Sequence, residues 1–134
     1  MSDPSSLDLG DVVARDVDEY IDSLDALEVV MLVFRESQQS WTPDQVAQKL
    51  RITVKVARRE LDRMRARGIA VPDGQDGSAV RFAAADMDRA AAVARIAAAY
   101  GTRRIELINH VAAQTLKRIQ SIANAFRLKK DDSE

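Results

Sequence analysis

The side chains best suited to binding chemistry are the lysines and arginines of residues 49–67. This stretch carries eight basic residues against two acidic ones, a balance of +6. Guanidinium and ammonium groups bind phosphate oxygens, and phosphate neutralisation supplies most of the non-specific affinity of proteins for nucleic acid. The residues that we expect to contact double-stranded DNA are Thr53, Lys55, Arg58, Arg59, Arg63 and, further along the chain, Arg81.

These side chains would have different roles in such an interface. Arg58 and Arg59 can each bind a guanine edge through two hydrogen bonds, or pair with a phosphate. Thr53 and Lys55 stand at the expected start of a helix, where backbone N–H groups also favour a phosphate.

The same stretch also allows a purely structural interpretation. Glu60 and Asp62 could form ordinary surface ion pairs with the neighbouring arginines. Residues 73–77 carry two acids and no base, which disfavours contact with a phosphate backbone. The balance of +6 favours DNA binding over this alternative.

Catalysis has little support in the sequence. The chain has no cysteine, no glycine-rich phosphate loop and no cluster with metal-ligand spacing, so we expect neither a metal nor another cofactor. The acid pairs Asp16/Asp18 and Asp86/Asp88 lie in polar surroundings, without the burial that raises a carboxyl pKa for acid catalysis. The single histidine, His110, is expected to pack or hydrogen-bond between helices. We therefore expect a protein that is not an enzyme.

Charge is distributed unevenly along the 134 residues, although the net charge is only −1. Residues 1–28 hold nine acids and one base. We expect residues 1–22 to form an acidic, partly disordered segment that is a solubilising tail, a competitor for the basic helix or a contact for another protein. The sequence has no apolar run of about 18 residues and no signal-peptide pattern, which predicts a cytoplasmic protein with no membrane association.

Capping signals define the helices that would position the basic residues. Ser23 is expected to cap a helix over residues 23–36. The stretch from Thr42 to Gln45 combines a threonine cap, a proline at the first helical position and a capping-box glutamine, which predicts a short helix over 43–50. The basic helix then spans residues 53–67, with Thr53 as its N-cap and its apolar residues facing the core.

A β-hairpin is expected directly after the basic helix. Gly68 suits the position after a helix end because it tolerates positive φ. Two short β-capable runs, residues 69–71 and 78–82, flank a turn rich in proline, glycine and aspartate. Arg81 would lie on the second strand.

Residues 84–130 are helical in character, with Asp86 as a cap and a break at Gly101 and Thr102. An apolar stripe follows this break and is too strong for a lone exposed helix. We expect it to form a homodimer, although packing across the chain's own domain is the alternative. The stripe residues assigned to dimerisation are Ile105, Ile108, Val111, Leu116, Ile119, Ile122 and Phe126.

The order of helix, short helix, basic helix and hairpin resembles the winged helix-turn-helix superfamily of bacterial transcriptional regulators. The resemblance is carried by WTPDQVA at 41–47, the turn Leu50-x-Ile52 and VARRELDRMRARGI at 56–69. It implies a mainly α fold with a small β-hairpin wing, in which the helix 53–67 enters the major groove and the wing lies against the DNA backbone.

The overall layout is similar to PadR-like and MarR-like regulators, where helices outside the winged domain form the dimer. The expected organisation is an acidic segment (1–22), a winged helix-turn-helix domain (23–83) and a helical dimerisation region (84–130). The alternative is a winged-helix module that binds another protein through its acidic N-terminus or its apolar C-terminal helix.

Overall fold

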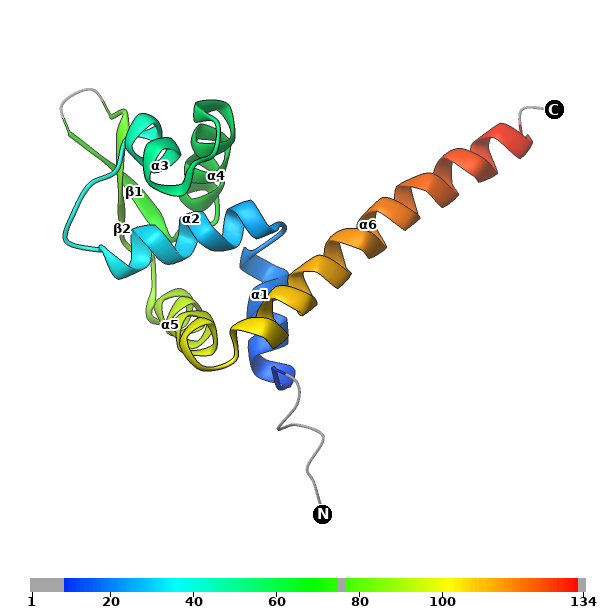
Figure 1. Ribbon diagram of the computed structural model, residues 1–134, viewed down its shortest axis with the longest axis horizontal. Coiled ribbons are helices and arrows are strands. Elements are labelled where there is room, and N and C mark those ends of the chain that lie inside the picture. The colour runs from blue at the N-terminus through cyan, green and yellow to red at the C-terminus, as the bar shows by residue number, and fades with distance from the viewer. Residues whose placement is uncertain (1–8, 75–76, 133–134) are drawn as a thin grey trace, which may run out of the picture.

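The computed structural model describes residues 9–74 and 77–132, of which most are helical (Figure 1). A small two-stranded antiparallel sheet accompanies the helices in this part of the chain. This layout is compatible with a winged helix. The elements, in chain order, are α1 (Asp11–Tyr20), α2 (Leu24–Arg35), α3 (Pro43–Leu50), α4 (Val54–Ala66), β1 (Ala70–Asp73), β2 (Ala79–Phe82), α5 (Met87–Thr102) and α6 (Arg104–Asp132).

The expected helix caps are all present. The Ser23 hydroxyl accepts a hydrogen bond from the Ala26 N–H at 3.0 Å. Thr42 and Gln45 form the complete capping box, in which each side chain accepts from the other residue's backbone N–H, at 3.2 and 3.0 Å. These local bonds satisfy N–H groups that have no partner within the helix, so they fix where α2 and α3 begin.

Gly68 ends α4 and directs the chain into the hairpin. Its φ is +76°, and a Cβ at this position would lie 2.8 Å from the Nε atom of Arg89. The two strands then pair in the register Ala70↔Phe82 to Asp73↔Ala79. Trp41 adds an isolated bridge to Val80, which ties the segment before α3 to the hairpin.

The core centres on α2, which lies between the α3–α4 pair and the C-terminal helices (Figure 1). Leu27 and Met31 of α2 and Leu61 of α4 are almost completely buried. The expected acidic N-terminal segment is only partly described, because residues 1–8 lie outside the described residues. Its second half forms α1, whose Val17 and Tyr20 belong to the same core. This half is therefore part of the folded body.

The two C-terminal helices divide at a different residue from the one expected. α5 continues through Gly101 and ends at Thr102, and the C-cap residue Arg103 still donates its N–H to the carbonyl of Ala99. α6 begins against the core, with Leu107 and Val111 buried, and then projects away from the body (Figure 1). None of the helices in the described ranges has the length and hydropathy of a membrane-spanning segment.

Candidate nucleic-acid interface

The α4 helix divides its residues between the core and an exposed basic face. Ala57, Leu61 and Met64 recur at helical spacing and are buried, as the sequence pattern predicts. The opposite side forms a shallow, open groove that runs along about three turns of the helix. Its lining residues are Lys55, Arg58, Arg59, Asp62, Arg63 and Ala66.

Lys55 and Arg58 are the cations of this groove with the greatest freedom to bind a ligand. Both are exposed, and in the part of the chain that the structure describes neither pairs with a carboxylate. Thr53 caps the same end of α4 by accepting a hydrogen bond from the Val56 N–H at 3.1 Å. The first two turns of α4 therefore combine two unpaired cations with a helix N-terminus.

Arg59 and Arg63 are held by a buried acid. The Glu60 side chain is only 1% exposed, and its Oε1 atom lies 3.1 Å from both Arg59 Nε and Arg63 Nη1. Glu60 therefore pairs with neighbouring arginines, as the structural interpretation allowed, but it does so on the buried side of α4 and not at the surface, whereas Asp62 is exposed. Burial of a carboxylate requires such paired hydrogen bonds, which limits both arginines as ligand contacts.

A second acid, Asp22, pairs with Arg63 and with Arg67, the residue that follows α4. It lies in the connector between α1 and α2, and its Oδ2 atom is 2.9 Å from Arg63 Nη1 and 3.4 Å from Arg67 Nη2. Arg67 also donates to the Tyr20 carbonyl at 2.6 Å. Sequence reasoning missed Asp22 because the contact spans 45 residues, and only the acidity of the segment signalled it.

Arg81 on the hairpin also has an acidic neighbour. Its Nε lies 3.6 Å from Asp73 Oδ2, across the strand pair. The Ser40 hydroxyl donates to the Asp73 carboxylate and, with the Gly74 N–H at 2.9 Å, holds the pKa of this carboxyl below its usual value. Asp73 thus stays ionised beside Arg81, which weakens the positive charge of the hairpin.

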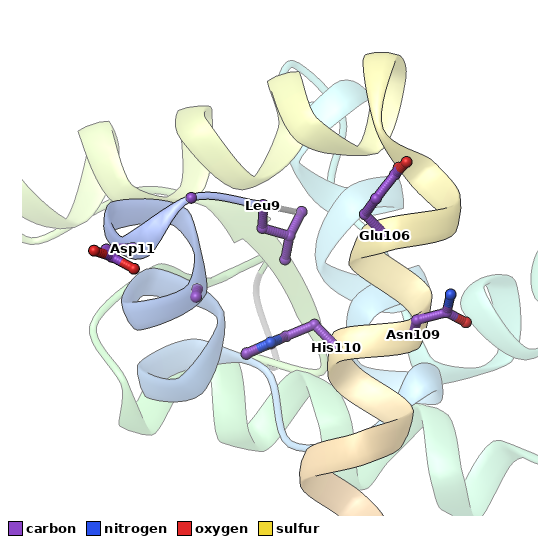
Figure 2. A pocket seen from close by; sticks show the side chains of 7 residues that line it. Leu9, Asp11, Glu106, Asn109 and His110 are labelled. Atoms are coloured by element: carbon purple, nitrogen blue, oxygen red, sulfur yellow. The ribbon is translucent and has the colours of Figure 1, made fainter. Parts of the chain in front are cut away.

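His110 is not among the residues that line the α4 groove. Its Nε2 atom is 2.8 Å from Asp18 Oδ1, so it joins α6 to α1. Figure 2 shows His110 extending from α6 into a shallow hollow between these helices, with Leu9, Glu106 and Asn109 around it. In the described ranges no three His, Cys, Asp or Glu side chains gather as a metal site requires.

The residues expected to form a dimer separate into two groups on α6. Val111 is buried and Ile108 is half-buried against the chain's own core, because the first turns of α6 pack on α1, α2 and α5. The remaining members are exposed by 55% to 73%: Ile105, Leu116, Ile119, Ile122 and Phe126. Every side chain from 116 to 127 is exposed, so this part of α6 is a single unpartnered helix.

The interface is interpreted from its own geometry, because no protein-family model, curated protein or solved structure matches this chain.

Proposed function

We propose that this protein is a DNA-binding transcriptional regulator that acts as a homodimer and inserts α4 into the major groove of double-stranded DNA. The observation that carries the proposal is the exposed and unpaired state of Lys55 and Arg58 beside the capped N-terminus of α4. Recognition helices of this type contact base edges with their N-terminal residues, and lysine and arginine there bind phosphates or guanine.

The arrangement of the neighbouring elements supports a winged helix. α3 and α4 form a helix pair joined by a short turn, in which Arg51 takes a left-handed conformation at φ 59°. The hairpin β1–β2 follows α4 directly and packs beside it. In this arrangement α3 would cross the DNA backbone, while the hairpin would stand as the wing.

The projecting half of α6 supports a dimer. Its exposed apolar positions Ile119, Ile122 and Phe126 are separated by three and four residues, the spacing of a coiled-coil seam. A single helix is marginal in water without a packing partner. A second copy of α6 would cover this stripe and place two α4 helices on one duplex.

A salt titration of duplex binding tests the proposal. Replacing both Lys55 and Arg58 with alanine should flatten the slope of log K against log salt by about 1.8 per protomer if both contact phosphates, since each contact contributes about 0.9. Arg15→Ala is the matched control, because Arg15 is an exposed cation on α1 and is not among the residues that line the α4 groove. Absence of duplex binding by the wild type at low salt, or equal slopes for the double variant and the control, would contradict the proposal.

The alternative function is a module that binds another protein. The exposed apolar stripe on α6 favours it, since such stripes mark interaction surfaces. Asp62 in the α4 groove and Asp73 beside Arg81 also favour it. A wild-type chain that is monomeric, fails to bind duplex and purifies with a stoichiometric protein partner would support this function instead.

A further inference from the structure

A second basic cleft adjoins the α4 groove and includes a residue from α6. It lies where the α1–α2 connector, the C-terminal half of α4 and the middle of α6 meet. Its lining residues are Asp22, Ser23, Arg59, Arg63, Arg67 and Arg118. Because Arg59 and Arg63 line both hollows, the cleft and the groove form one continuous basic surface.

The cleft carries excess positive charge. Four arginines contribute +4, and Asp22 with the buried Glu60 contributes −2, which leaves +2. Arg118 is exposed and donates a hydrogen bond from Nη1 to the Asp22 carbonyl at 2.8 Å. A guanidinium has five N–H donors, so this contact orients Arg118 while leaving donors for an anion.

The Asp22 carboxylate lines the cleft, and only one of its two oxygens has partners among the described residues. Its Oδ2 atom faces Arg63 and Arg67, but its Oδ1 atom is buried and has no hydrogen-bond partner within the described residues. An unpaired buried oxygen raises the free energy of an arrangement. An incoming anion that engages the arginines would therefore displace a carboxylate that has only one of its two oxygens paired.

We propose that this cleft binds a phosphate of the DNA backbone, that Arg118 contacts this phosphate directly, and that the phosphate displaces the Asp22 carboxylate from Arg63 and Arg67. The proposal rests on the proposed function, because the phosphate belongs to the duplex held by α4. Arginine suits this position since its planar group binds phosphate through two parallel hydrogen bonds. Arg118 would thus make α6 part of the DNA interface.

The test compares single variants in duplex binding over a range of salt. Arg118→Ala should flatten the slope of log K against log salt by about 0.9 per protomer. If the variant and the wild type bind equally at 1 M salt, the variant should therefore bind about 8-fold more weakly than the wild type at 0.1 M salt. Lys117→Ala is the matched control, because Lys117 is the adjacent exposed cation on α6 and does not line the cleft. Asp22→Asn should have the opposite effect and tighten binding several-fold.

Sedimentation and thermal unfolding of each variant establish that the fold and the oligomeric state are retained. Arg118→Lys, which keeps the charge, should retain the wild-type salt slope. If the wild type binds duplex and Arg118→Ala matches it in slope and affinity, the cleft proposal is overturned while the proposed function stands. If Asp22→Asn gives no gain in affinity, displacement of this carboxylate is overturned. Failure of the wild type to bind duplex overturns both proposals.

Discussion

Truncating Ile119 to alanine should weaken self-association through α6 by about 30-fold. The Ile119 side chain is 57% exposed, so roughly half of its surface is available for burial by a partner helix. Complete burial of such a side chain is worth about 1.5–3 kcal/mol, so truncation should remove about 1 kcal/mol per protomer. A two-fold symmetric contact counts this loss twice, which gives about 2 kcal/mol, and about 1.4 kcal/mol corresponds to a tenfold change in affinity.

Sedimentation equilibrium over a concentration series measures this change directly. Gln120→Ala is the matched control, because Gln120 is the next residue along α6 and lies outside the apolar stripe. Phe126→Ala should also weaken association, and Phe126 lies far along the projecting part of α6, where 71% of it is exposed. A wild-type chain that stays monomeric at about 100 µM, or an Ile119→Ala variant that associates like the control, would refute this reasoning.

Two further predictions concern the fold itself. Gly68→Ala should lower the free energy of unfolding by about 1–2 kcal/mol, because φ is +76° and the new Cβ would approach Arg89, whereas Gly101→Ala in α5 has open space and should raise it by about 0.5 kcal/mol. Denaturant unfolding measures the stability of both variants, and equal changes would contradict a special backbone requirement at Gly68. Burial raises the pKa of the phenols of Tyr20 and Tyr100, and at Tyr100 a hydrogen bond to Glu28 raises it further. The stability linked to these phenols should be fully present below about pH 10 and lost as the pH rises through their folded-state pKa, so ultraviolet titration should show the urea-unfolded chain ionising at lower pH than the folded one.

Local signals predicted the helices well because their causes are local. The capping box from Thr42 to Gln45 and the glycine at position 68 act within a few residues, and both form as expected. The packing partner of α1 could not be predicted in this way. Asp16 of α1 receives two hydrogen bonds from Arg95 of α5, at 2.6 and 3.1 Å, across 79 residues of sequence. An apolar pattern indicates that α1 is helical, but it does not indicate which helix covers it.

The site itself was only partly predictable, because charge counting treats all residues of a segment alike. Glu60 and Asp62 stand two residues apart, which separates them by about 200° around a helix. Glu60 therefore shares the buried side of α4 with Ala57 and Leu61, while Asp62 is exposed. Helical spacing alone could have made this distinction. The contacts of Asp22 with Arg63 and Arg67 could not have been found without the tertiary structure.

Because of these contacts, only part of the +6 charge balance in residues 49–67 is available to a ligand. Three arginines from the middle and the end of this stretch are committed to the chain's own carboxylates, because Arg59 and Arg63 hold Glu60 while Arg63 and Arg67 hold Asp22. The first half keeps Lys55 and Arg58 unpaired. In the proposed regulator α4 would read base edges with its N-terminal residues, and Lys55 and Arg58 stand at that end of the helix. The paired arginines stand at the other end, where an exchange of Asp22 for a backbone phosphate would bring them into the same interface.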